Sequence, residues 1–327
     1  MTPIPAEILD AIRSARRIGI AAHVRPDGDA VGSVTGLALS LKLAGKEVFP
    51  ILEDGIPPHL AFLPGTDLVQ KPSADAPELD LAIALDTATH ERLGEGVAAV
   101  FAKAPLLINI DHHGTNEGYG HLKHIDVNSP AVGQIVYDLI QQAALPMDDS
   151  VRQNLFAAIS TDTGSFQFSS TGARTHRIVA EMLANGLDTA RLATLLYQSH
   201  PRRRIELQRA MLNEMTFRAQ DRIVSWNLTQ QLIQSISMLP GDTEGLIDTL
   251  RMIDSVVACV IFEETEDGKV RVSARSKDTR VNVSDVCAQF GGGGHRMAAG
   301  ARLKGPISEA STRFLSALED EVLRRLD

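Results

Sequence analysis

A histidine and two aspartates stand close together in the stretch HVRPDGDAVGS, His23 to Ser33. His23 ends an apolar run, and Asp27 and Asp29 flank a glycine in the turn that follows. Carboxylates packed into a turn repel one another and lose hydration, so they need a compensating positive charge. A lone DGD sequence is ordinarily a surface turn, because Asp and Gly favour turns on their own account. The stretch becomes informative only together with other acidic groups of the chain.

Two further apolar runs end in residues of the same kind. Asp86 ends LDLAIALD, and Asp111, His112 and His113 end PLLINIDHH. Asp162 lies at the end of a predicted helix, DDSVRQNLFAAISTDTGSF, which could return to the same place. Taken singly, these residues could be helix caps, strand caps or solvated ends. Taken together, histidines and carboxylates without thiolates are a ligand set for a divalent metal, with manganese the best candidate and iron, cobalt or magnesium as alternatives.

The number of these groups exceeds what one ion requires. Two ions that share a bridging carboxylate would neutralise the cluster. The hydroxide shared by such ions would be a nucleophile near neutral pH. We therefore expect a hydrolytic centre with two divalent metal ions.

Alternating elements in the first half of the chain would bring these groups together. Short apolar runs predict strands, and AVGSVTGLALSLKLAG predicts a helix closed by Gly45. Continuous apolar strands between helices favour a parallel sheet covered on both faces. Ligands of such sheets bind beyond the carboxyl ends of the strands, where the polar residues follow. The sequence thus predicts an α/β domain with its chemistry at one edge of the sheet.

The second half of the chain has a different pattern. YQSHPRRRIELQRAMLNEM predicts a connector leading into a helix, and its arginine run is typical of a solvated face. From Thr216 onward the pattern predicts hairpin strands, with a turn at Glu266 to Lys269. We therefore place a domain boundary near Pro201.

Composition limits the class of protein. A chain of 327 residues with 44% hydrophobic residues predicts two globular domains. Cys259 and Cys287 form no close-spaced ligand pair, the N-terminus lacks a signal-peptide layout, and no apolar run approaches the roughly 20 residues that span a bilayer. We expect a reduced, cytoplasmic protein without a membrane segment. The net charge of -9 disfavours tight, non-specific holding of long nucleic acid and leaves room for small phosphorylated ligands.

Five motifs, HVRPDGDAVGS, ALDTA, IDHHGTN, STDTGSF and GGGGHRMAAGA, resemble in order and spacing those of the DHH phosphoesterases that carry a DHH-associated C-terminal domain. They are most similar to the bifunctional oligoribonuclease and PAP phosphatase group, called NrnA-type. The resemblance implies a catalytic metal-binding domain over residues 1–190, with a mainly parallel sheet flanked by helices. It further implies a helical connector over 191–215 and a smaller α/β substrate-binding domain over 216–327. The active site would lie in the cleft between the two domains.

The same resemblance assigns roles to the polar residues. It implies six metal ligands: His23 and Asp27 on one ion, Asp29, His112 and Asp162 on the other, and Asp86 as the bridge between them. Asp111 would orient a ligand without binding metal. His113 would face the scissile phosphate and either hold it or protonate the leaving oxygen. Arg25, where relatives often have a smaller polar residue, receives no role.

The second half supplies candidates for substrate contacts. The glycines before His295 and the small residues after it let the backbone approach a ligand closely, and exposed N–H groups suit phosphate. For the glycines alone, a flexible linker is the alternative. RVSARSK predicts a strand with Ser273 and Arg275 on one face, where Arg275 could bind a phosphate or stack on a base. The resemblance assigns the arginine and the glycine–histidine motif to the nucleotide, so the expected contacts are Ser273, Arg275, Gly292, Gly293, Gly294 and His295.

These observations predict a manganese-dependent phosphoesterase that hydrolyses short RNA oligonucleotides and 3'-phosphoadenosine 5'-phosphate (pAp). A cyclic- or linear-dinucleotide phosphodiesterase would use the same metals and is the main alternative. A family II inorganic pyrophosphatase would share the N-terminal motifs, but GGGGHRMAAGA argues against it. A non-catalytic nucleotide sensor would need a degraded metal site, whereas all expected ligands are present. The oligomeric state stays open, a homodimer included.

Overall fold

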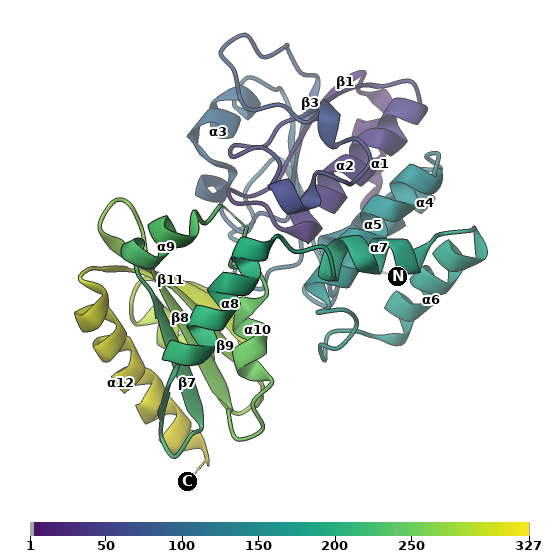
Figure 1. Ribbon diagram of the computed structural model, residues 1–327. Helices are drawn as coiled ribbons and strands as arrows, with labels where there is room; N and C mark the ends of the chain where they lie inside the picture. The colour runs from purple at the N-terminus through teal and green to yellow at the C-terminus, as the bar shows by residue number, and fades with distance from the viewer. Residues whose placement is uncertain (1–2, 240, 327) are drawn as a thin grey trace. The chain divides into compact units, whose positions relative to one another are not determined.

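The computed structural model describes residues 3–239 and 241–326. The chain divides into two compact units, one ending at Ser199 and the other beginning at His200. Each unit is a sheet covered by helices on both faces (Figure 1). Within the described residues, no helix is both long and apolar enough to cross a membrane.

The first unit is built on a parallel sheet with the strand order β2-β1-β3-β4-β5. Its strands are short, and β3 is buried along its whole length, as continuous apolar runs predict for a sheet covered on both faces. The predicted parallel α/β architecture is confirmed. The strands are β1 (Arg17–Ala21), β2 (Glu47–Pro50), β3 (Leu81–Leu85), β4 (Leu107–Asp111) and β5 (Leu122–Ile125).

Helices cover both faces of this sheet. One face packs against α1, α2, α4 and α5, and the other packs against α3. The helices of the unit are α1 (Ala6–Ser14), α2 (Gly28–Leu43), α3 (Glu95–Phe101), α4 (Val132–Gln142), α5 (Asp149–Asp162), α6 (Ala173–Ala184) and α7 (Thr189–Tyr197). Short 3₁₀ turns are η1 (Pro58–Leu60), η2 (Thr66–Leu68) and η3 (His90–Leu93).

The second unit is built on a mixed sheet with the order β10-β11-β9-β8-β7-β6. The predicted hairpins β6–β7 and β8–β9 are present and antiparallel. Strands β7 and β8 pair in parallel, which the sequence pattern did not predict. The strands are β6 (Thr216–Arg218), β7 (Ile223–Leu228), β8 (Ala258–Glu264), β9 (Lys269–Ser276), β10 (Gly293–His295) and β11 (Ala298–Lys304).

Alternating strand residues bury both faces of the second sheet. One face packs on α11 and the long helix α12, which runs beside β7 and β8 (Figure 1). The opposite face packs on α8, α9 and α10 around the buried side chain of Trp226. The helices are α8 (Arg202–Glu214), α9 (Gln230–Ile236), α10 (Leu246–Arg251), α11 (Val283–Ala288) and α12 (Ile307–Leu326).

The arginine run at the start of α8 is only partly the solvated face that its composition suggests. Arg202 is exposed. Arg203 Nε donates to Asp242 Oδ2 at 2.7 Å, and Arg204 donates to the carbonyl of Glu244 at 2.5 Å. Because the Asp242 side chain is buried, it needs a charged partner, and two of the three arginines hold its loop against α8.

Candidate metal centre and substrate surface

The candidate metal centre lies where the strand order of the first sheet reverses. His23 follows β1 and Asp86 follows β3, and these two strands are neighbours in the sheet. The chain leaves β1 towards α2 on one face and leaves β3 towards α3 on the other. Loops that diverge in this way open a crevice at the carboxyl ends of the strands. The topology therefore places both residues in the position where such sheets bind ligands.

The first cluster consists of His23, Asp27 and Asp86, whose ligand atoms all lie within 4.8 Å of one another. His23 Nε2 is 3.3 Å from Asp86 Oδ2 and 3.7 Å from Asp27 Oδ2. The other ring nitrogen, Nδ1, lies 2.9 Å from the carbonyl of Val24, to which it can only donate. This hydrogen bond assigns a proton to Nδ1, so Nε2 is the nitrogen that faces the carboxylates and that could bind a cation once it has lost its own proton.

The second cluster consists of Asp29, His112 and Asp162, again within 4.8 Å of one another. His112 Nε2 is 3.4 Å from Asp162 Oδ2, and Nδ1 donates to the carbonyl of Ser129 at 3.1 Å. His112 Nε2 also lies 3.6 Å from Asp86 Oδ1. Asp86 thus presents one oxygen to the histidine of each cluster.

The Oδ1 atom of Asp86 is buried and has no hydrogen-bond partner within residues 3–239 and 241–326. A buried carboxylate oxygen without a donor is costly unless a cation or a proton compensates it. Asp86 also adopts a left-handed backbone conformation, with φ at 55°, which a non-glycine residue rarely does. The surrounding structure therefore holds this carboxylate at some cost between the two histidines, as a bridging ligand would require.

Crowding of the carboxylates shifts their protonation. Burial, together with the charges of Asp86 and Asp162, raises the pKa of Asp29 well above its usual range. Burial and the charges of Asp27 and Asp86 do the same to the pKa of Asp162. Burial by itself lowers the pKa of His23, but the carboxylates of Asp27 and Asp86 outweigh burial and raise it to about 10. The cluster therefore retains protons that a divalent cation would displace on binding.

Two of the carboxylates also cap helices. Asp27 Oδ1 accepts from the N–H groups of Asp29 and Ala30, so it caps α2. Asp29 accepts from the N–H groups of Val132 at 2.6 Å and Gly133 at 2.8 Å, in the first turn of α4. Because a cap uses only some of the lone pairs of a carboxylate, the capping role and the ligand role are compatible. These hydrogen bonds fix the direction of both side chains.

Glycines in α2 bring Asp162 to the site. A Cβ atom at Gly28 would lie 2.4 Å from Thr161 Oγ1, and one at Gly32 would lie 2.4 Å from the carbonyl oxygen of Asn154. Only glycine therefore allows α2 to approach α5 this closely, and Asp162 is the last residue of α5. The four-residue spacing of these glycines is a signal in the sequence that our sequence analysis did not use.

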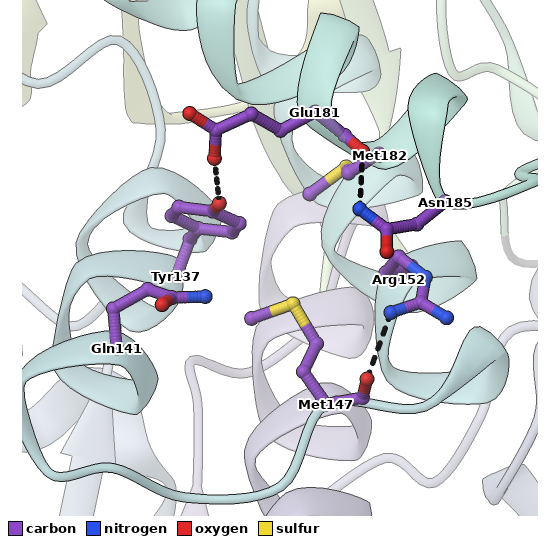
Figure 2. Close-up of a pocket in the computed structure, with 7 residues that line it drawn as sticks. All are labelled: Tyr137, Gln141, Met147, Arg152, Glu181, Met182 and Asn185. Carbon is purple, nitrogen blue, oxygen red and sulfur yellow. Dashed lines mark hydrogen bonds between the residues drawn. The ribbon is translucent and has the colours of Figure 1, made fainter.

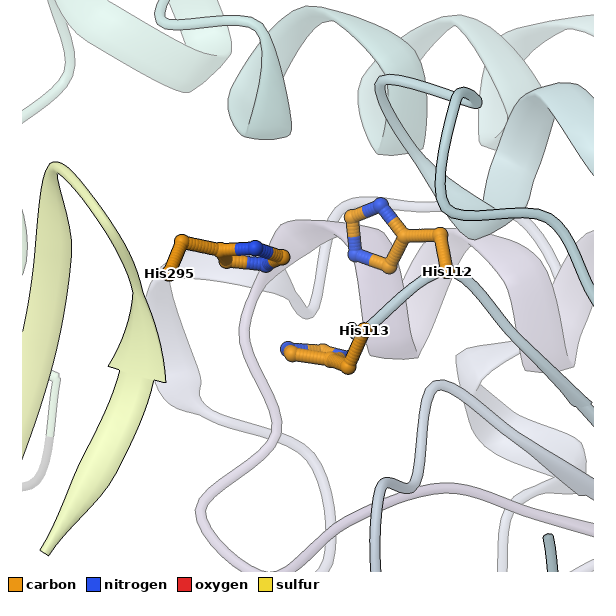
Figure 3. A group of neighbouring side chains, drawn as sticks. All are labelled: His112, His113 and His295. Carbon is orange, nitrogen blue, oxygen red and sulfur yellow. The ribbon is translucent and has the colours of Figure 1, made fainter. Parts of the chain in front are cut away.

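Asp111 and His113 form a pair beside the two clusters. His113 Nδ1 donates to Asp111 Oδ1 at 2.8 Å, and the rings of His112 and His113 pack edge to face with centroids 4.7 Å apart (Figure 3). Burial lowers the pKa of His113, but the carboxylates of Asp111 and Asp86 outweigh it and raise the pKa. Asn116, which our sequence analysis did not nominate, donates to Asp111 Oδ2 at 2.6 Å. A ring held in this way can carry a proton or bind an anion.

The predicted substrate residues lie on one face of the second sheet. Arg275 pairs with Ala298 of β11, and Ala298 pairs with His295 of β10, so the three residues form one row across the strands. Residues in one row point to the same face, and two strand spacings separate Arg275 from His295 by about 10 Å. Ser273 lies in the neighbouring row, opposite Gly300, on the same face as Arg275.

The last two glycines before His295 belong to a strand and not to a flexible linker. Gly293 and Gly294 open β10, the edge strand of the sheet. A Cβ atom at Gly292 would lie 2.2 Å from the carbonyl oxygen of Gly300. Gly294 has a φ of 140°, and its Cβ would lie 2.6 Å from the carbonyl of Ala298. Close approach within the β10–β11 hairpin therefore requires glycine at both positions, whatever the backbone N–H groups bind.

A cavity of about 240 Å³ in the first unit contains none of the nominated residues (Figure 2). Its polar groups are largely used within the protein. The Tyr137 hydroxyl donates to Glu181, Asn185 donates to the Glu181 carbonyl, and Arg152 donates to the carbonyl of Met147. We therefore identify the two clusters, and not this cavity, as the candidate active site.

Comparison with known proteins identifies the family. The N-terminal domain of the DHH family matches residues 17–160, and the DHHA1 domain matches residues 229–323. Bifunctional oligoribonuclease and PAP phosphatase NrnA of Thermus thermophilus is 34% identical over 320 residues, which cover 98% of this chain and 94% of that protein. The chain belongs to the DHH phosphoesterase family. It is thus an enzyme, and the resemblance seen in the five motifs is confirmed.

Two further similarities cover nearly the whole chain. A probable bifunctional oligoribonuclease and PAP phosphatase NrnA of Streptococcus mutans is 30% identical over 296 residues, covering 90% of this chain and 92% of that protein. The crystal structure of an exopolyphosphatase-related protein from Bacteroides fragilis superposes with a TM-score of 0.88 at 25% identity, covering 98% of both chains. This DHH phosphoesterase therefore shares its two-unit architecture with a solved structure.

Proposed function

We propose that this DHH phosphoesterase hydrolyses short RNA oligonucleotides and pAp with the help of two divalent cations, for which Mn²⁺ is the preferred ion. The observation that carries the proposal is Asp86, whose two oxygens face the histidines of two separate ligand clusters. The names of the relatives at 34% and 30% identity, both oligoribonuclease and PAP phosphatase, support the choice of substrates.

The donor set fits a pair of divalent ions. Each cluster offers one imidazole Nε2 and carboxylate oxygens within 4.8 Å of one another. This mixture of nitrogen and oxygen ligands suits Mn²⁺ better than Ca²⁺ or Mg²⁺, which prefer oxygen ligands alone. The ions would be held by His23 and Asp27, by Asp29, His112 and Asp162, and by Asp86 in common. When bound, they would supply Lewis-acid stabilisation of the phosphate, and they would lower the pKa of a bound water so that a hydroxide nucleophile is available near neutral pH.

Residues of the chain would orient the reaction around the metals. Val24 and Ser129, through their carbonyls, hold the rings of His23 and His112 so that Nε2 points inward. Asp111 holds the ring of His113 through Nδ1. We propose that His113 Nε2 faces the scissile phosphate, where a protonated ring would bind a phosphate oxygen or donate its proton to the leaving oxygen.

The second unit would bind the nucleotide. We propose that Arg275, Ser273 and His295 contact it, with Gly292, Gly293 and Gly294 allowing close approach of the backbone. The strand pairing supports this assignment, because it places Arg275 and His295 on one face of the sheet, on either side of the small residue Ala298. In this proposal residues 1–190 form the catalytic domain, 191–215 the connector and 216–327 the substrate-binding domain.

Competition between substrates tests the proposal. The Mn²⁺-loaded protein is offered pAp, a dinucleotide, a longer RNA, cyclic di-AMP and pyrophosphate, and kcat/KM is compared. We expect the highest values for pAp and the dinucleotide, and a steep fall as the RNA lengthens. A preference for cyclic di-AMP would replace our proposal with the dinucleotide phosphodiesterase alternative. Equal rates on dinucleotides and long single strands at the same salt concentration would refute the restriction to short substrates.

A further inference from the structure

Asn116 stands at the centre of a hydrogen-bond network behind the candidate active site. Its Nδ2 atom lies 2.6 Å from Asp111 Oδ2, 2.9 Å from Asn109 Oδ1 and 3.2 Å from the carbonyl of Thr87. Its Oδ1 atom accepts from the N–H group of Gly118 at 2.6 Å. Thr87 lies just beyond β3 and Asp111 ends β4, so one side chain ties the ends of two neighbouring strands together.

The two oxygens of Asp111 are divided between Asn116 and His113. Oδ2 accepts from Asn116 Nδ2, and Oδ1 accepts from His113 Nδ1. A carboxylate held by donors on both oxygens cannot rotate without breaking a hydrogen bond. The Asp111 side chain is completely buried, so water cannot readily replace a lost donor. Asn116 therefore fixes the plane of the carboxylate that in turn fixes the ring of His113.

Asn116 is separate from the metal clusters. Within the described chain, its side-chain hydrogen bonds go to Thr87, Asn109, Asp111 and Gly118 and to none of the six proposed metal ligands. Its loss should therefore leave the ions in place and act on the site through the Asp111–His113 pair.

We propose that Asn116 is a positioning residue of the phosphoesterase reaction, acting through Asp111 on His113. The proposal rests on the proposed function, in which His113 faces the scissile phosphate. Asn116 does not touch the substrate. Its contribution is to hold the His113 ring with Nδ1 on Asp111, so that Nε2 stays directed away from that carboxylate.

Two variants and a double-mutant cycle test the proposal. Asn116→Ala removes the whole amide, and Asn116→Leu keeps its approximate size and shape but lacks the donor. Both should lower kcat by about 10- to 100-fold, the range for residues that orient active groups, with KM and metal content unchanged. In a His113→Ala background, Asn116→Ala should cost no more than about twofold further, because the group on which it acts is gone. Asn185→Ala is the matched control, since that amide donates to the Glu181 carbonyl away from the site.

The cycle separates positioning from a merely structural role. If the Asn116 and His113 losses multiply, if metal content falls with kcat, or if kcat is unchanged, the proposal is wrong. Circular dichroism and Tm are measured for each variant, and the leucine variant decides if the alanine variant alone unfolds. The wild type is first measured on pAp, a dinucleotide and bis(p-nitrophenyl) phosphate. If the wild type hydrolysed neither nucleotide, the proposed substrates would be wrong. The double-mutant cycle could still be measured with bis(p-nitrophenyl) phosphate.

Discussion

At the scale of single residues, several side chains of the site belong to a cluster and also make hydrogen bonds to the backbone. Asp27 and Asp29 are each members of one cluster and also cap α2 and α4. His23 and His112 each use Nδ1 on a backbone carbonyl and present Nε2 to carboxylates. Such double use restricts each side chain to one direction, which a metal site needs because its ligands must converge before the ion binds.

Asp86 provides the most direct residue-scale prediction. Asp86→Asn keeps the shape of the side chain but removes the charge that both clusters share. We expect the variant to bind fewer than two ions per chain and to lose turnover by at least about 1,000-fold, because the proposed ions would no longer be bridged. Metal analysis after Mn²⁺ reconstitution checks the stoichiometry. Asp75→Asn, at an exposed loop position, should behave as the wild type. Full activity with one bound ion would contradict the two-metal proposal.

His23 gives the metal-free protein a predictable pH dependence. Its folded pKa of about 10 lies above the value of about 6.5 for an unfolded histidine. The protonated ring therefore stabilises the metal-free protein fully below about pH 6.5, and this contribution is lost as the pH rises towards 10. A bound cation takes the place of the proton, so the Mn²⁺-loaded protein should not show this loss.

Thermal unfolding measures the effect. Between about pH 6 and about pH 9, Tm should fall in EDTA and stay nearly level with saturating Mn²⁺. His23→Gln should flatten the fall in EDTA, since glutamine does not titrate. A Tm in EDTA that rises over this range would show that the sign of the His23 contribution is wrong.

At the scale of elements, the contact between α2 and α5 decides whether Asp162 reaches the other ligands. Gly32→Ala would place a methyl group against the backbone of α5, at Asn154. Overpacking of this kind costs about 1 to 3 kcal/mol, and the shift of α5 should weaken metal binding because Asp162 moves with it. Urea unfolding and a Mn²⁺ titration measure the two effects. Gly172→Ala, at the N-cap of α6, where a methyl group would meet nothing within 4 Å, should leave Mn²⁺ binding unchanged and cost no more than about 1 kcal/mol, the usual penalty of alanine at an N-cap.

At the scale of the whole molecule, our proposal assigns chemistry to the first unit and recognition of the nucleotide to the second. We expect Arg275→Ala and His295→Ala to keep their metal content and to lose about 1.5 to 3 kcal/mol in kcat/KM on pAp or a dinucleotide, the range for a charged hydrogen-bond partner. An artificial diester too short to reach these residues should lose much less. His112→Ala should damage both kinds of substrate together through the metal.

The control for this division of roles is another arginine of the second unit. Arg302 lies exposed on β11 and pairs with Asp267, near the opposite end of β9 from Arg275. Arg302→Ala should leave both substrates unaffected. If the Arg275 and His295 variants lost the diester and the nucleotides equally, these residues would belong to the catalytic centre and the division would be wrong.

The sequence by itself determined the local elements and the kinds of ligand. Apolar runs that end in Asp86 and Asp111 predicted strands of a parallel sheet, because strands covered on both faces are mostly apolar until they end. The hairpin β8–β9 followed from a period of two around a turn. The nomination of His23, Asp86 and His112 as candidate metal ligands rested on the chemistry of their side chains, and the structure brings these side chains into two clusters. These features depend on neighbouring residues, so they can be predicted from a single sequence.

Only the tertiary structure decided how distant segments meet. It showed that Asp29 caps α4, that glycines of α2 admit α5, and that Asn116 holds Asp111. It also paired β7 in parallel with β8 and set Arg275 and His295 in one row. Strand register and helix approach depend on contacts between residues far apart in the chain, and periodicity carries no information about which partner is chosen. For this reason the candidate ligands could be proposed from the sequence, whereas Asn116 and the backbone carbonyls that hold the histidine rings could not.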